Sequence, residues 1–407
     1  MNSLESLDLS FNQLFGEIPD HLAKGCTSLQ LLVLSNNSIQ GQIFSTNFNL
    51  KNLLRLQLDS NNFTGRIPDS LSKASNLAGL YLSDNKISGG IPSWLGNISS
   101  LDDIIMPNNH LEGPIPLEFC RLDNLEVLDL TGNNISGSLP SCFSPPSITQ
   151  VHLSKNRLDG QLKEAFYNSS SLVTLDLGYN RLDGSIPTWI GRLTNLTYLT
   201  WSNNNFEGEV PTQLCKLKQL RLVDISHNNL YGRLPPCLDV TAPHDSDHDI
   251  VSPSSISMPP VDSPSMPLTD GSILSSPAEA PSSGPPMRKE ETVEFRTKNN
   301  SYFYQGKVLT GMYGIDLSNN KLTSLIPQQI GNLTRIRTLN LSPNNFTGPI
   351  PPTFAKLRQI ESLDLSYNNL NGTIPHQLVE LDSWSFFSVA HNNLSGNIPN
   401  ESTLLYL

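Results

Sequence analysis

Apolar and polar residues alternate along short stretches that recur throughout the chain, and each stretch closes on an asparagine. In the unit LVTLDLGYN, the apolar positions are Leu172, Leu175 and Leu177, and Asn180 is the last residue. Because successive side chains of a strand point to opposite faces, this pattern predicts a short strand whose leucines point to one side. The residues between the leucines are then expected to face solvent.

The closing asparagine returns at a nearly fixed interval of 24 residues, with one interval of 25, one of 23 and a single jump of 92. The asparagines are Asn12, Asn37, Asn61, Asn85, Asn109, Asn133, Asn156, Asn180, Asn204, Asn228, Asn320, Asn344, Asn368 and Asn392. A period of this length in the frame LxxLxLxxN is the signature of a leucine-rich-repeat solenoid. The sequence therefore predicts an α/β-type solenoid, mostly β, with a parallel concave sheet and about 14 coils stacked on one another.

Two further positions of the repeat carry structural information. The asparagine side chain is expected to bond to backbone groups that the turn leaves without partners, and so to form a ladder along the stack. The motif Gly-x-Ile-Pro follows it in many coils. Proline removes a backbone donor and favours extended chain, so the convex side is expected to hold polyproline II or short edge strands rather than long helices.

The jump divides the chain into three parts: ten repeats in residues 1–238, an island in residues 239–311, and four repeats in residues 312–407. Residues 239–283 are rich in Pro, Ser and Asp, which predicts a flexible segment. Its HDSDHD stretch, residues 244–249, does not indicate a metal site. Residues 292–309 alternate apolar and polar positions, which predicts a strand or hook that folds back on the solenoid. This segment is either one wall of a ligand site or a simple tether.

Four of the five cysteines form two pairs with the same spacing, Cys120 with Cys142 and Cys215 with Cys237. Adjacent coils lie roughly 5 Å apart at the strands, which matches the Cα separation of a disulfide, so both bonds are expected. The alternative is four buried thiols. The sequons at Asn97, Asn168 and Asn332 all lie twelve residues after a ladder asparagine, so we expect glycans on the convex side.

The net charge of −11 argues against nucleic acid and anionic membranes as partners. Met1 opens directly into a repeat, and no signal peptide, end cap or apolar stretch long enough to span a bilayer is evident. We therefore expect a fragment or a truncated gene product that makes no membrane contact of its own.

The sequence resembles plant leucine-rich-repeat receptor-like proteins. The LxGxIP form of the repeat, the island placed before four final repeats, the stretch EFRTKNNSYFYQGKVLTGMYGIDLSNNKL and the FCxL…LPxCF cysteine pair carry this resemblance. It implies plant-type coils in the ectodomain of a receptor on the extracellular side of the plasma membrane. Such receptors perceive pathogen-derived or developmental peptides and signal by recruiting a co-receptor or adaptor receptor kinase.

No nucleophile, phosphate-binding or metal-ligand motif is present, so we expect neither an enzyme nor a cofactor. Candidate ligand residues are therefore sought on the exposed strand positions, because Tyr and Arg often dominate interfaces. On the concave face they are Tyr81, Ile105, His152, Tyr179, Tyr198, Thr200, Arg221 and His227. The island contributes Phe295, Tyr302 and Tyr304. By resemblance, the co-receptor face contains Arg337, Tyr367, Phe386 and His391.

Three alternatives to a receptor-like protein remain. One is a secreted inhibitor resembling the polygalacturonase-inhibiting proteins, which lack an island. Another is the ectodomain of a receptor kinase. The third is a truncated, non-functional copy of either kind of receptor.

Overall fold

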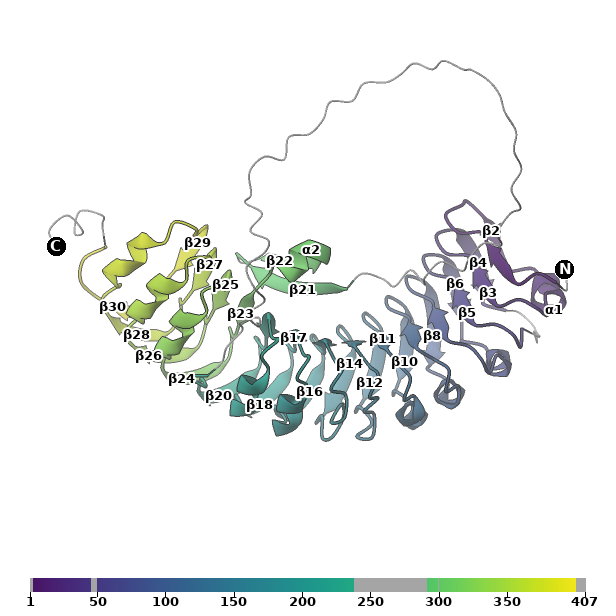
Figure 1. The fold of residues 1–407 in the computed structure, drawn as a ribbon, viewed down its shortest axis with the longest axis horizontal. Helices are drawn as coiled ribbons and strands as arrows, with labels where there is room; N and C mark the ends of the chain where they lie inside the picture. Colours follow the sequence, from purple (N-terminus) through teal and green to yellow (C-terminus); the bar gives the residue numbers. More distant parts are fainter. Residues whose placement is uncertain (1–2, 45–49, 238–290, 299, 400–407) are drawn as a thin grey trace, which may run out of the picture. The chain divides into compact units, whose positions relative to one another are not determined.

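A computed structural model describes residues 3–44, 50–237, 291–298 and 300–399, and its strands form two long parallel sheets (Figure 1). Each coil contributes one strand to each sheet, as the repeat predicts. The predicted flexible segment, residues 239–283, and the HDSDHD stretch lie outside the described residues.

The first sheet holds the strands of the LxL frame. They are β1 (Ser6–Asp8), β3 (Leu31–Val33), β5 (Arg55–Gln57), β7 (Gly79–Tyr81), β9 (Asp103–Ile105), β11 (Val127–Asp129), β13 (Gln150–His152), β15 (Thr174–Asp176), β17 (Tyr198–Thr200), β19 (Leu222–Asp224), β23 (Gly314–Asp316), β25 (Thr338–Asn340), β27 (Ser362–Asp364) and β29 (Phe386–Ser388). Their leucines are buried: Leu175, for example, is fully inaccessible.

The second sheet follows the ladder asparagines. Its strands are β2 (Phe15–Gly16), β4 (Ser38–Gln42), β6 (Asn62–Gly65), β8 (Lys86–Gly90), β10 (His110–Gly113), β12 (Asn134–Gly137), β14 (Arg157–Gly160), β16 (Arg181–Ser185), β18 (Asn205–Glu209), β20 (Asn229–Arg233), β24 (Lys321–Leu325), β26 (Asn345–Gly348), β28 (Asn369–Gly372) and β30 (Asn393–Leu394).

Short helices complete most coils. The α-helix α1 spans Asp20–Gly25, and the 3₁₀ helices are η1 (Asp69–Lys73), η2 (Ser93–Asn97), η3 (Leu117–Arg121), η4 (Thr188–Arg192), η5 (Thr212–Lys216), η6 (Gln328–Asn332), η7 (Pro352–Lys356) and η8 (His376–Glu380). A proline in extended conformation precedes each 3₁₀ helix; Pro187 has φ −67° and ψ 142°, in the polyproline II region. The predicted extended chain is present, but each of these coils adds one helical turn after it.

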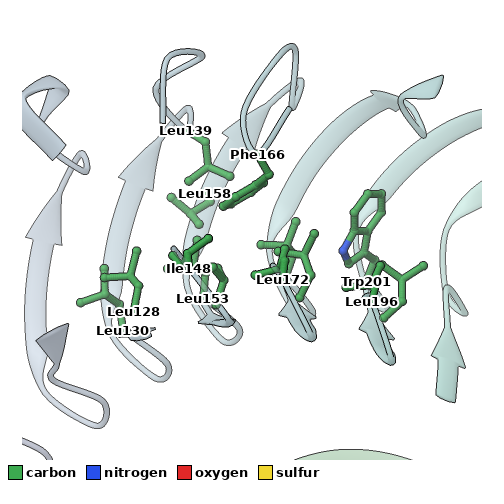
Figure 2. Close-up of a cluster of buried hydrophobic side chains, with 14 of the residues drawn as sticks. Leu128, Leu130, Leu139, Ile148, Leu153, Leu158, Phe166, Leu172, Leu196 and Trp201 are labelled. Carbon is green, nitrogen blue, oxygen red and sulfur yellow. The ribbon is translucent and has the colours of Figure 1, made fainter. Parts of the chain in front are cut away.

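The core is a stack of side chains enclosed by successive coils. Figure 2 shows Leu130, Leu153 and Trp201, which occupy the same position of their coils, in this interior. Trp201 replaces the usual leucine and stacks on Phe206, with 5.1 Å between ring centroids. The larger ring is therefore accommodated as packing and is not available to a ligand.

The predicted asparagine ladder is present. Asn180 accepts a hydrogen bond from the backbone N of Leu158 (3.0 Å), and its amide nitrogen donates to the carbonyls of Leu153 and Leu177 (3.0 Å each). The ladder continues across the jump in sequence, because Asn320 accepts from the backbone N of Leu230 at 3.0 Å and donates to the carbonyl of Ile225 at 3.0 Å. Strand β19 accordingly pairs directly with β23, Leu222 opposite Gly314.

Candidate functional site

An antiparallel hairpin of β21 (Thr292–Thr297) and β22 (Asn300–Gln305) lies on the first sheet and is followed by the short helix α2 (Gly306–Thr310) (Figure 1). Val293 and Phe295 of β21 are buried against Tyr198 and Leu222 of the sheet. The ring of Phe295 occupies the space above Gly314, where a Cβ atom would come within 2.6 Å of it. The alternating apolar residues of β21 thus form the face that attaches the hairpin.

Charged residues hold the hairpin along its length. Lys155 Nζ lies 2.8 Å from Glu294 Oε2. At the other end, Lys298 Nζ lies 3.1 Å from Glu361 Oε2, and the backbone N of Lys298 donates to Ser362 Oγ at 3.3 Å. Burial raises the pKa of Glu361, but hydrogen bonds from Lys298 and Arg337 outweigh it and leave this pKa below its usual value. The hairpin therefore extends along the stack from the coil of β13 to that of β27.

Two arginines of the first sheet fix the chain after the hairpin. Arg221 donates to the carbonyl of Thr310, and Arg337 Nε donates to the carbonyl of Gly311 at 3.2 Å. Arg337 also lies 2.5 Å from Glu361. Both side chains were predicted as partner-binding residues, and both are engaged in positioning the island.

Two pockets lie along the first sheet beside the hairpin, and we call them together the hairpin groove. Five of the described hairpin residues line the first pocket, and Arg296 alone of them lines the second. The first has a volume of about 290 Å³ and contains Asp176, Thr200 and Asp224 from the sheet. The second has a volume of about 500 Å³ and extends to the last repeats. His227 and Arg296 line both pockets, so the two meet at this pair.

One face of strand β21 carries charged residues that line the first pocket. Glu294 and Arg296 both line it, and because they are two residues apart on a strand they share one face. Ser301, which pairs with Arg296 across the hairpin, lines the same pocket. The apolar face of the hairpin thus attaches it, and the polar face forms a wall of the groove.

One position of successive strands forms a polar row along the groove. In register this row is Asp176, Thr200, Asp224, Asp316, Asn340, Asp364 and Ser388. All of them except the fully buried Asp316 line one of the two pockets and form the groove floor. Neighbours in the row bond to one another: Thr200 Oγ1 donates to Asp176 Oδ1 at 2.9 Å, and Asn340 Nδ2 donates to Asp316 Oδ2 at 3.2 Å.

Three carboxyl groups of this row, those of Asp176, Asp224 and Asp316, are harder to ionise than in water. Burial raises the pKa of both Asp176 and Asp224. For Asp316, burial and then the charge of Asp224 on the neighbouring strand raise the pKa to about 7. The floor is therefore less negative than its sequence indicates, because the low polarity of the interior disfavours charge.

The opposite edge of the groove is formed by the residue that precedes each ladder asparagine. Tyr179, His227, Tyr367 and His391 have φ values of 54°, 52°, 48° and 54°, in the left-handed region. Tyr367 and His391 stack on each other, with 4.1 Å between ring centroids and 18° between ring planes. Burial and then the charge of Arg296 lower the pKa of His227, against the opposing effect of Asp224.

The expectation that Tyr81 and Ile105 face solvent is wrong, since their exposed fractions are 7% and 5%. The Tyr81 hydroxyl donates to Asp103, and the ring lies over Gly79, where a Cβ atom would come within 2.5 Å of it. Ile105 packs against Tyr81 and Val127. A glycine on the strand thus lets the aromatic ring lie flat on the sheet.

Tyr198 and Thr200 are also buried, each with an exposed fraction of 4%, contrary to the prediction. Tyr198 is covered by the hairpin, and Thr200 is bonded to Asp176. The related expectation that the aspartate position faces solvent is wrong for Asp224 and Asp316, which are buried.

The remaining candidates are distributed as follows. Tyr179 and His227 line the first pocket, while His152 is half-buried in register with Asp176 and lines neither pocket. In the island, Phe295 is buried, Tyr304 is half-buried and Tyr302 is exposed. Tyr367, Phe386 and His391, predicted as a co-receptor face, line the second pocket. Phe295 also lines the first pocket, so the structure brings residues of all three predicted groups into one groove.

Both disulfides that the cysteine spacing predicts are present, each with a Cα–Cα distance of 5.4 Å. The sequon residues Asn97, Asn168 and Asn332 are exposed, and Asn97 and Asn332 end the helices η2 and η6. None of the three lines either pocket, so glycans there would leave the groove accessible.

Several groove residues were not predicted. Glu294 and Arg296 lie in the segment predicted to fold back on the solenoid, but the predicted ligand residues of that segment are all aromatic. Asn203 occupies the edge position between Tyr179 and His227. The repeat frame itself identifies Asn203, because every edge residue directly precedes a ladder asparagine.

Two models of the leucine-rich repeat match the chain, one over residues 2–63 and 146–206 and the other over residues 76–98, 124–145, 314–333, 335–357 and 359–381. Together these matches cover more than half of the sequence. The chain belongs to the leucine-rich-repeat proteins.

Within this family it is similar to plant receptors. It is 51% identical over 53 residues to Cuscuta receptor 1 of Solanum lycopersicum and 42% identical over 53 residues to Receptor-like protein 13 of Arabidopsis thaliana. Each alignment covers 13% of this chain and 5% of the relative. The structure is similar to that of the Arabidopsis receptor kinase HAESA in complex with the peptide hormone IDA and the co-receptor SERK1, with a TM-score of 0.72 and 26% identity.

That alignment covers 99% of this chain and 61% of the HAESA chain, so the present chain spans less than two thirds of HAESA, and its matches cover only a small part of the two receptor relatives. Among the described residues, no helix has the length and apolar character needed to cross a bilayer.

Proposed function

We propose that this chain is a ligand-recognition region of a plant cell-surface receptor-like protein, and that it binds a peptide or an extended protein segment in the hairpin groove. The observation that carries the proposal is the continuity of the two pockets through His227 and Arg296. A groove along several parallel strands suits a linear ligand better than a compact one, since an extended chain contacts many coils at once.

The similarity to HAESA, which was solved with a peptide hormone and a co-receptor, supports this class of ligand. The hairpin also supports a peptide as the ligand. Its apolar face packs on Tyr198 and Leu222, and Glu294 and Arg296 therefore line the groove. Of the two interpretations of residues 292–309, a wall of a ligand site is therefore favoured over a simple tether.

Signalling is proposed to require a co-receptor kinase that joins the complex over the last repeats. Tyr367, Phe386 and His391 line the groove there, whereas Arg337 lines neither pocket and holds the chain after the hairpin through Gly311. A ligand in the second pocket would therefore form part of the surface that the kinase contacts. The proposed location is the extracellular side of the plasma membrane, and the two disulfides suit an oxidising compartment.

The test is a selection of random linear peptides displayed on phage against the secreted, oxidised chain. Peptides that bind the groove are expected to lose affinity for His227→Ala and Arg296→Glu, while Tyr231→Ala is the matched control. Tyr231 is half-exposed on β20 of the second sheet and lines neither pocket. Selected peptides that bind all three variants as they bind the wild type would place the ligand surface elsewhere and refute the proposal.

A further inference from the structure

The second pocket differs from the first in the residues that bound it. Tyr367, His391 and Phe386 give it an aromatic side, whereas the first pocket is bounded mainly by carboxyl, hydroxyl and amide groups. Phe386 belongs to β29 of the first sheet, and the two other rings belong to the groove edge. Three rings from two coils thus line this pocket, two stacked on each other at the edge and one on the strand.

The Tyr367–His391 pair is both exposed and fixed in place. Tyr367 keeps 55% of its surface exposed although it stacks on His391 at 4.1 Å. Both residues have the left-handed backbone conformation of the repeat. The asparagine that follows each of them bonds to the backbone: Asn368 donates to the carbonyl of Ser366, and Asn392 donates to the carbonyl of Leu365. A rigid ring pair loses little conformational freedom when a ligand stacks on it, which favours binding.

Several polar groups beneath the rings are bonded within the protein. Asp364 Oδ1 accepts hydrogen bonds from the backbone N and the hydroxyl of Ser366, at 3.0 and 2.7 Å. The hydroxyl of Ser342 lies 2.7 Å from that of Ser366. The hydroxyl of Ser318 lines the same pocket and is buried without a hydrogen-bond partner among the described residues. The exposed part of the pocket is its aromatic edge, where an occupant gains stacking and burial of apolar surface.

Aromatic rings attract two kinds of occupant, a cationic side chain and a second aromatic ring. A cationic side chain binds ring faces, but in this pocket it would meet charges of both signs, the carboxyl group of Asp364 and the guanidinium group of Arg296. A neutral aromatic ring gains the stacking on the Tyr367–His391 pair independently of either charge.

We propose that the second pocket is a subsite for an aromatic side chain of the ligand, formed by Tyr367, His391 and Phe386. This rests on the proposed function, because it assigns a chemical preference to one part of the same groove. The ligand is then an extended peptide with Phe, Tyr or Trp at the position that reaches the last two repeats.

The experiment uses peptides selected on phage against the wild-type chain and then synthesised. Each aromatic residue of a selected peptide is replaced by alanine in turn, and affinities are measured by titration calorimetry for the wild type, Tyr367→Ala, His391→Ala, Tyr367→Phe and the control Tyr231→Ala. One aromatic residue of the peptide is expected to contribute about tenfold to affinity, and Tyr367→Ala is expected to remove that contribution. Tyr367→Phe retains the ring and should bind as the wild type does.

The outcomes separate the two proposals. Peptides that respond to His227→Ala and Arg296→Glu, but show no aromatic preference and bind Tyr367→Ala unchanged, overturn the subsite and leave the proposed function standing. A selection that yields no groove-binding peptide overturns both. Circular dichroism and thermal melts of each variant establish that it is folded, since Tyr367 is largely exposed and its loss removes no core packing.

Discussion

The ring of Phe295, in β21 of the hairpin, lies on Gly314, the first residue of β23 in the first sheet, although the two residues are 19 positions apart in the sequence. Any side chain at position 314 would meet the ring, because even a Cβ atom would lie 2.6 Å from it. This contact joins the hairpin to the stack, and with it one wall of the groove.

The first prediction concerns that contact. Gly314→Ala is expected to displace Phe295 and to destabilise the docked hairpin by about 1–3 kcal/mol, the range typical of overpacking. Hydrogen exchange should show faster exchange in β21 and β22, with little change in the coils before β15. Gly178→Ala is the matched control, since a Cβ atom there would be 3.4 Å from its nearest neighbour, an ordinary contact. Equal protection of the hairpin in both variants would mean that Phe295 does not anchor it.

The second prediction is a pH dependence of stability that originates in Asp316, the fully buried member of the polar row along the groove. The pKa of Asp316 is raised from 3.8 to about 7 in the folded state, so the folded protein keeps a proton that the unfolded chain releases. Its contribution favours folding below about pH 4 and is lost as pH rises to about 7. Urea denaturation at pH 4.5 and 7.5 is expected to give the higher stability at pH 4.5, after allowance for changes elsewhere in the chain. Asp316→Asn should reduce the difference, and an unchanged difference would assign it to other groups.

The third prediction tests the ladder where it crosses the jump in sequence. Asn320→Ala leaves the backbone N of Leu230 and the carbonyl of Ile225 without this partner, which is expected to cost about 1–3 kcal/mol. Chemical denaturation measures this cost. Asn12→Ala is the comparison, because Asn12 is exposed and donates to carbonyls of its own coil. A larger loss in Asn12→Ala would contradict the role assigned to Asn320.

The fourth prediction concerns the disulfide between Cys120 and Cys142. Replacement of both cysteines by serine removes a cross-link that closes a loop of 22 residues, and the loop-entropy relation gives a loss of about 3 kcal/mol. A thermal melt should show the loss. Reduction of the wild type tests both disulfides together and should lower the melting temperature further. If the double serine variant melts as the wild type does, this bond adds nothing to stability.

The regular part of the fold was predictable from sequence because each structural role falls on a fixed position. Asn180 bonds to backbone groups of its own and the preceding coil, and the asparagines at that position of the neighbouring coils do the same. Cys120 and Cys142 lie at equivalent places of adjacent coils, so their spacing alone indicates their proximity.

The groove was less predictable because the hairpin decides which positions are exposed. Tyr198 occupies a strand position that faces solvent in an uncovered coil, yet it is buried because Phe295 and Val293 lie on it. Neither the repeat frame nor local alternation indicates where residues 292–305 dock. Tyr81 illustrates a different reason: the size of its neighbour, Gly79, determines whether the ring stands out from the sheet or lies on it.

Because β19 pairs directly with β23, two coils that are far apart in the sequence are adjacent in the stack. The stretch of chain between Arg233 and Thr292 adds no strand to either sheet among the described residues. Its length therefore does not set the register, and the entropy of loop closure changes only slowly with length. In engineering terms this is a natural place to cut the molecule. Two separately produced pieces, one ending after Cys237 and one beginning at Thr292, carry complementary strand edges and are suited to reassembly into a single sheet.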